Sequence, residues 1–286
     1  MRRVGLVVHP ARDAARGAAS ALERWLGERE VEVRRWDGLR TEDPPSASAF
    51  AEGLDLVVSI GGDGTFLRAA HLASRDDVPV LGVKVGRMGF LTEVEPDEAP
   101  AVLSRMLAGT ARIEERLAVL AEPDGSTFDP QWALNEVIVE KRARHRLIRL
   151  AVFVDEAYVT TFSADGVIVA TPTGSTAYSF SAGGPIVSPS VPCVVVTPIA
   201  AHMVFDRSLV LGRSERVTLE VLGEEEGLMS ADGRESLELP VGSRVRIGAA
   251  SRPARFVRRE DAPGFVELVR DKFGLPGADG EPEDGR

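Results

Sequence analysis

The pattern of hydrophobic and polar positions changes character near Arg112. Before that residue, short continuous apolar runs at 4–8, 54–60 and 78–85 alternate with segments whose apolar residues recur every three or four positions. Such runs are typical of strands buried on both faces of a parallel sheet, and the three-to-four spacing predicts helices. Their alternation predicts a doubly wound, Rossmann-like α/β domain over residues 1–112.

Beyond that boundary the helical spacing fades, and short β-rich runs separated by turn residues predict an all-β, sandwich-like domain over residues 113–262. The segment 263–286 begins with apolar residues at helical spacing, including Phe265 and Leu268. It predicts a closing helix that packs back on the first domain. From Gly274 onward the chain is rich in Gly, Pro and acidic residues, and we expect a disordered tail.

Composition narrows the class of protein. With 44% hydrophobic and 27% charged residues, the chain has the composition of an ordinary globular protein. Its net charge of -10 argues against a dedicated nucleic-acid binder, because phosphate-backbone affinity depends on clustered Lys and Arg. Cys193 is the single cysteine, so no intrachain disulfide forms. No apolar run approaches membrane-spanning length, and we expect a cytoplasmic protein without a membrane partner.

A glycine turn ends the apolar run 54–60 and contains one carboxylate, in the order Gly61-Gly62-Asp63-Gly64. A helical pattern follows it, so the turn exposes the backbone N–H groups of a helix N-terminus, where phosphate binds well. Asp63 would repel a phosphate, so it is unexpected if the turn only holds phosphate. Its presence is explained if it accepts the proton of a hydroxyl being phosphorylated or helps to hold a metal ion. The alternative is a tight turn with Asp63 as helix N-cap. The spacing alone does not separate these interpretations.

Three further segments are candidates for ligand contacts. The glycine-punctuated loop 82–91 should leave the same edge of the sheet as Asp63, with Lys84 and Arg87 available to phosphate. Asn135-Glu136 interrupts an apolar strand and needs either a ligand or an exposed strand end to satisfy its polar groups. The run 163–185 is rich in small hydroxylated residues, but it lacks the Lys that a P-loop requires.

Two other features of the sequence give weaker evidence about function. A hairpin turn explains Asp232-Gly233 adequately. The four histidines have no ligand spacing, and we assign no residue to a metal ion.

In chain order, these motifs resemble those of the NAD kinases, which phosphorylate the 2′-hydroxyl of the adenosine ribose of NAD. The resemblance rests on Gly61-Gly62-Asp63-Gly64-Thr65, on Asn135-Glu136 and on the run from Asp165 to Pro185. The glycine turn alone is shared with 6-phosphofructokinases and with diacylglycerol and sphingosine kinases. The combination of all three motifs is specific to NAD kinases. It implies a site in the cleft between an α/β domain and a β-sandwich-like domain.

The resemblance also implies roles for individual residues. Asp63 would be the general base, and Gly61, Gly62 and Gly64 would let a triphosphate approach the backbone. The residues expected to bind NAD are Asn135, Glu136, Arg146, Asp165, Thr176, Ala177, Tyr178 and Ser181. Ser163 stands where some members carry Arg, and a small residue there is compatible with accepting both NAD and NADH.

The implied phosphoryl donor is ATP or polyphosphate, with Mg²⁺ or another divalent cation, and the implied assembly is a homodimer or homotetramer. Three positions depart from the family by adding positive charge, namely Lys84, Arg87 and Arg234. They leave open a paralogue with a more anionic acceptor or a different phosphoryl donor such as polyphosphate; the alternative is simple lineage variation with no change of substrate. A lipid or sugar kinase of the wider superfamily and a non-catalytic nucleotide-binding protein are the competing hypotheses.

Overall fold

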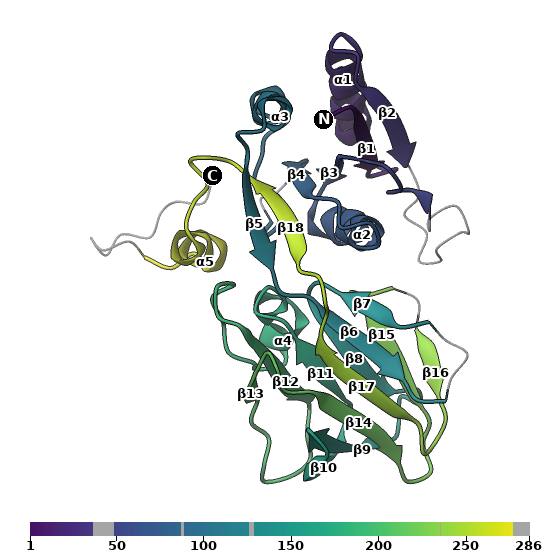
Figure 1. Ribbon diagram of the computed structural model, residues 1–286. Helices are drawn as coiled ribbons and strands as arrows, with labels where there is room; N and C mark the ends of the chain where they lie inside the picture. Colours follow the sequence, from purple (N-terminus) through teal and green to yellow (C-terminus); the bar gives the residue numbers. More distant parts are fainter. Residues whose placement is uncertain (37–48, 87–88, 126–128, 235, 277–286) are drawn as a thin grey trace.

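The computed structural model describes residues 1–36, 49–86, 89–125, 129–234 and 236–276. Its first sheet has the strand order β2-β1-β3-β4-β18-β5 and is parallel except for β5 (Figure 1). The strands are β1 (Arg3–Val8), β2 (Glu32–Trp36), β3 (Leu56–Gly61), β4 (Val80–Lys84), β5 (Arg112–Arg116) and β18 (Ala254–Arg258). The helices are α1 (Asp13–Gly27), α2 (Asp63–Ser74) and α3 (Ala99–Ala108). Apolar faces of α1 and α3 pack with one side of the sheet, and that of α2 packs with the other.

The second domain consists of two antiparallel sheets that share one apolar core. The first, in the order β10-β9-β14-β17-β6-β7, contains β6 (Val119–Pro123), β7 (Gln131–Ala133), β9 (Ile148–Val154), β10 (Ala157–Ala164), β14 (Val217–Leu222) and β17 (Arg244–Ala249). The other, in the order β13-β12-β11-β8-β15-β16, contains β8 (Glu136–Lys141), β11 (Gly166–Ala170), β12 (Cys193–Ile199), β13 (Leu209–Gly212), β15 (Gly227–Ala231) and β16 (Leu237–Leu239). A 3-10 helix, η2 (Gly174–Thr176), and a short helix, α4 (Tyr178–Ser181), follow β11. The predicted fold class, an α/β domain followed by a β-sandwich-like domain, is confirmed.

The chain returns to the first sheet near its end, which corrects the expected extent of the second domain. Strand β18, within the predicted range 113–262, lies between β4 and β5, where Phe256 is the register partner of both Val80 and Glu114. Most of β5 also falls in that range and belongs to the first sheet. A run of β-forming residues predicts a strand but does not identify the sheet that the strand joins. The α/β domain is therefore built from two separate stretches of sequence.

The last described helix, α5 (Phe265–Phe273), contacts both domains. The ring centre of Phe273 lies 4.7 Å from that of Phe180 in α4 and 6.1 Å from that of Phe90, which follows β4. Leu268 is buried. Most of the expected tail, residues 277–286, lies outside the described residues. None of the helices in the described part of the chain is long and apolar enough to cross a membrane.

Candidate active site

The glycine turn lies where β3 passes into α2. Gly62 is the N-cap and Asp63 the first residue of the helix, so the first N–H groups of α2 have no partner within the helix. A Cβ added at Gly62 or Gly64 would meet no atom within 4 Å, so the backbone is accessible there. At Gly61 a Cβ would lie 2.4 Å from Thr65 Oγ1, so glycine is required for packing. The buried hydroxyls of Ser59 and Thr65 have no hydrogen-bond partner among the residues that the structure describes. This accessible, donor-rich turn suits phosphate groups.

The carboxylate of Asp63 is held by the loop that follows β4. Phe90 N–H donates to Asp63 Oδ2 at 2.8 Å and Leu91 N–H donates to Oδ1 at 3.2 Å. Thr92 Oγ1 donates to Oδ1 at 3.3 Å. Gly61 is the register partner of Lys84, so this loop starts beside the glycine turn, as predicted from the common edge of the two strands. The three donors orient the carboxylate at the N-terminus of α2.

A carboxylate from the turn after β15 organises the Asn135-Glu136 segment. Asp232 accepts hydrogen bonds from the N–H groups of Leu134, Asn135 and Glu136, at 2.7, 2.8 and 3.1 Å. It has a φ of 50°, a conformation that Asp tolerates better than most residues. Sequence reasoning explained this turn as a hairpin and missed its role, although the Asp-Gly pair was the signal for a special backbone geometry.

Glu136 lies beside Asp232 in a buried position. Burial, and secondly the negative charge of Asp232, raise the pKa of Glu136 to about 8. Its Oε2 atom is buried without a hydrogen-bond partner, and the Asn135 side-chain amide makes no hydrogen bond within the described residues. Burial raises the pKa of Asp232 as well, but the charge of Arg234 and three N–H groups stabilise its ionised form, so we place the negative charge of the pair there and the proton on Glu136. Buried polar groups of this kind fit a ligand with hydroxyl groups.

The hydroxyl-rich run is largely bonded within the protein. Thr171 Oγ1 donates to the Leu134 carbonyl at 2.6 Å, and Ser175 Oγ donates to the Pro172 carbonyl at 2.7 Å. Ser179 Oγ lies 3.1 Å from Thr197 Oγ1. A Cβ at Gly174 would lie 2.1 Å from the Asn135 carbonyl oxygen, so glycine permits the close contact between these segments. Much of the run positions Asn135 rather than presenting its hydroxyls to a ligand.

The remaining residues expected to bind NAD divide along β8. Asn135 and Glu136 lie at its start, whereas Asp165 lies at its other end, where its carbonyl accepts from Lys141 N–H at 2.9 Å. Tyr178 lies only four residues after Gly174, which packs against Asn135, and burial, with the charges of Glu140 and Asp165, raises the pKa of its phenol. Ala177 is the N-cap of α4 and Ser181 is its last residue. A six-residue strand spans roughly 20 Å at about 3.4 Å per residue, so one chain does not bring Asp165 together with Asn135 and Glu136.

Arg146 lies beyond that far end of β8. It occupies the turn before β9 and forms an ion pair of 2.8 Å with Glu225.

Of the three residues that add positive charge relative to the family, the structure describes Lys84 and Arg234, which have different surroundings. Lys84 forms an ion pair with Glu95. Arg234 donates to the Trp132 carbonyl at 2.5 Å, and its charge acts on Asp232. Arg87 lies outside the described residues. The positive charge of Lys84 is therefore already balanced by a carboxylate of the same chain.

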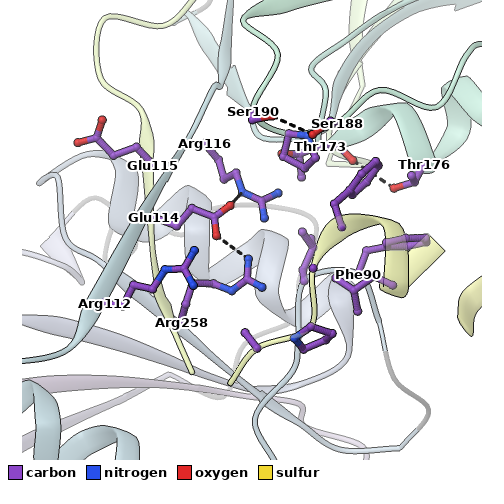
Figure 2. A pocket seen from close by; sticks show the side chains of 17 residues that line it. Phe90, Arg112, Glu114, Glu115, Arg116, Thr173, Thr176, Ser188, Ser190 and Arg258 are labelled. Carbon is purple, nitrogen blue, oxygen red and sulfur yellow. Dashed lines mark hydrogen bonds and ion pairs between the residues drawn. The ribbon is translucent and has the colours of Figure 1, made fainter. Parts of the chain in front are cut away.

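A cavity of about 440 Å³ lies between the two domains, and Figure 2 shows side chains that line it. It is lined by β5, β18 and the start of α5, and by Thr173, Thr176, Ser188 and Ser190 from the second domain. Arg258 forms ion pairs with Glu93 at 2.9 Å and with Glu114 at 2.7 Å, so its charge is balanced. Phe90 and Leu91 belong to the wall, and the same two residues hold Asp63 through their N–H groups. Thr176 thus borders an interdomain cavity close to the loop that orients Asp63.

Within the described residues, no group of three or more His, Cys, Asp or Glu side chains is arranged to hold a metal ion. A divalent cation would need most of its ligands from phosphate oxygens. Asp63 is the carboxylate within the glycine turn itself. The residues present fit a cation that arrives with its nucleotide.

The fold and site define a two-domain enzyme with a phosphate-binding turn and a carboxylate beside an interdomain cleft. Family models of the ATP-NAD kinase N-terminal and C-terminal domains match residues 46–111 and 134–259. An NAD kinase of Rhodococcus erythropolis is 40% identical, over 96% of this chain and 94% of the relative. One of Mycobacterium bovis is 38% identical, over 96% of each. The chain belongs to the NAD kinase family.

Two solved structures are similar over most of their length. A yeast NADH kinase complexed with NADH has a TM-score of 0.87 and 25% identity, and covers 100% of this chain and 89% of that one. An NAD kinase from Archaeoglobus fulgidus in complex with ATP has a TM-score of 0.74 and 29% identity, and the match covers 91% of this chain and 94% of that one. These similarities confirm the resemblance noted in the sequence.

Proposed function

We propose that this chain transfers the γ-phosphoryl group of ATP to the 2′-hydroxyl of the adenosine ribose of NAD, with Asp63 as the general base. The observation that carries the proposal is the juxtaposition of a fixed carboxylate with an accessible helix N-terminus. The ribose oxygen forms a bond to the γ-phosphorus while the bond from that phosphorus to the β-phosphate oxygen breaks. Asp63 receives the hydroxyl proton, and ADP leaves. Because a ribose hydroxyl is a poor nucleophile, positioning and proton removal provide much of the rate.

The glycine turn supports a nucleoside triphosphate as donor. The open space at Gly62 and Gly64 and the first N–H groups of α2 would receive phosphate oxygens. Mg²⁺ bound with the donor would neutralise charge on the transferred group. A polyphosphate chain would present the same oxygen atoms, so it is the alternative donor for the same turn.

The acceptor would be held by the polar groups at the start of β8. The Asn135 amide and the protonated Glu136 carboxyl are available to base or ribose atoms, and Thr176 borders the adjoining cavity. Asp165 lies at the other end of that strand, so a second copy of the chain would have to contribute it to the same NAD molecule. This separation supports a homodimer or homotetramer.

The test measures the formation of NADP from NAD, or of NADPH from NADH, with ATP or polyphosphate as donor, in all four combinations. We expect NAD with ATP to react and the Asp63→Asn variant to lose most turnover. Failure of NAD with every donor, together with rapid reaction of another adenosine-containing acceptor, would overturn the proposal.

A further inference from the structure

The C-terminal helix brings a lysine to the proposed phosphate site. Lys272 is in the last turn of α5 and is half-buried. Its Nζ atom lies 5.9 Å from the centre of the Phe90 ring, and Phe90 is the residue whose N–H holds Asp63. The next residue, Phe273, packs against both Phe90 and Phe180, which fixes this end of the helix. Lys272 therefore has a defined position over the loop that orients the general base.

The charges around Lys272 are those of the site itself. Burial lowers the pKa of Lys272, the negative charge of Asp63 raises it, and the positive charge of Lys84 lowers it. The ammonium group is thus close enough to both residues for their charges to act on it. Asp63 opens the helix whose N-terminus forms the glycine turn, and Lys84 is the register partner of Gly61.

The ammonium group of Lys272 forms no ion pair within the described part of the chain. In the described ranges, no carboxylate oxygen lies within 4.0 Å of its Nζ atom. The other lysines differ, since Lys84 pairs with Glu95 and Lys141 pairs with Asp165. A half-buried cation without a paired anion is costly unless an anion arrives from outside. The phosphate groups expected at the glycine turn are such anions.

We propose that Lys272 contacts the phosphate oxygens of the phosphoryl donor and makes the C-terminal helix part of the active site. The inference rests on the proposed function for the identity of the donor. Lys is suited to this task because its ammonium group acts as a point charge on phosphate. Asp63 keeps its own hydrogen bonds to Phe90, Leu91 and Thr92, so Lys272 remains available to the donor.

A purely structural explanation exists, because a cation in the last turn also stabilises the C-terminus of a helix. Arg270 provides the matched control, since it lies in the same turn and is partly exposed, with Asp271 as its ion-pair partner. Loss of either charge should have a similar effect on the helix. Only the loss of the Lys272 charge should weaken binding of the phosphoryl donor.

The experiment compares Lys272→Gln, Lys272→Arg and Arg270→Gln in the full chain. We expect Lys272→Gln to raise the KM for ATP and to weaken binding of a non-hydrolysable ATP analogue by about ten- to a hundred-fold, as for a lost charge-assisted hydrogen bond. The KM for NAD should stay within about twofold, Lys272→Arg should restore most of the loss, and Arg270→Gln should match the original chain.

Equal donor binding in Lys272→Gln and Arg270→Gln, whether unchanged in both or weakened in both, would overturn the inference. Analogue binding needs no turnover, so it separates this inference from the proposed reaction. If the original chain bound the analogue but made no NADP, the proposed function would fail while the role of Lys272 would still be decided.

Discussion

Gly89 and Asp63 fit together so closely that a side chain at residue 89 would overlap with the carboxylate. A Cβ built on Gly89 would lie 1.7 Å from Asp63 Oδ1 and 2.5 Å from Oδ2. The absence of that side chain lets the N–H groups of Phe90 and Leu91 reach the carboxylate. Two glycine-containing segments, one after β3 and one after β4, thus fit together to hold Asp63, the proposed general base.

The first prediction concerns the base itself. Asp63→Asn preserves the shape of the side chain but removes its ability to accept the ribose proton, so we expect kcat to fall by at least about 100-fold. Binding of NAD, measured by calorimetry, should change little, because the amide oxygen still accepts a hydrogen bond from the loop. Turnover near that of the original chain would show that Asp63 is not the base.

The second prediction separates activity from stability at Gly89. In Gly89→Ala the new methyl group displaces the end of the Asp63 side chain rather than the backbone. We expect the free energy of unfolding to fall by only about 1–2 kcal/mol, from lost hydrogen bonds. In contrast, kcat should fall about as far as in Asp63→Asn.

Gly17→Ala is the control for that variant. Gly17 lies within α1, where a Cβ would meet no atom within 4 Å. Alanine there should leave kcat unchanged and raise the stability by about 0.5–1 kcal/mol. Equal kcat in Gly89→Ala and the original chain would contradict the proposed fit between Gly89 and Asp63.

The fold class was predictable because the period of the hydrophobic pattern reports local structure. Continuous runs such as 54–60 correspond to buried strands of the parallel sheet, and the shift in pattern near Arg112 marks the change to antiparallel sheets. Strand β18 was misplaced because its partner β4 is more than 150 residues earlier in the chain. A pattern along the chain contains little information about such distant pairing.

The site shows the same limit. Asp63 could be proposed from the sequence because the turn that holds it is local, and a carboxylate between glycines is unusual at a phosphate site. Asp232 was missed as a site residue because its contacts lie 96–98 residues away. The hydroxyl-rich run was interpreted as ligand-binding, yet Thr171, Ser175 and Ser179 bond within the protein. Sequence shows that such groups need partners but not which partners they have.

The third prediction tests the docking of the C-terminal helix. Phe273→Ala removes ring contacts with Phe180 and Phe90, which we expect to cost about 1–3 kcal/mol of docking free energy. Because Lys272 would then lose its fixed position, the KM for ATP should rise. Val266→Ala is the control on the same helix, since Val266 is 78% exposed. Hydrogen exchange at α5 should increase only in Phe273→Ala; equal protection in both variants would contradict the docking role.

The fourth prediction uses the raised pKa of Glu136. Its pKa is about 8 in the folded chain against 4.5 for an ordinary Glu, so between these values the folded state binds more protons than the unfolded state. Stability from this group is therefore present at low pH and is lost as pH rises toward 8. Glu136→Gln removes the titration. We expect the variant to gain stability relative to the original chain by up to about 1.4 kcal/mol per pH unit in that window.

Urea unfolding of both proteins without nucleotide, at about pH 5.5 and about pH 7.5, measures this difference. Glu122→Gln is the control, because Glu122 is exposed and its replacement should leave the pH dependence unchanged. The free energy of unfolding of Glu136→Gln could instead differ from that of the original chain by the same amount at both pH values. That result would show that Glu136 is ionised throughout. The proton would then belong elsewhere in the Glu136 and Asp232 pair, and Glu136 would meet the acceptor as a charged group rather than as a hydrogen-bond donor.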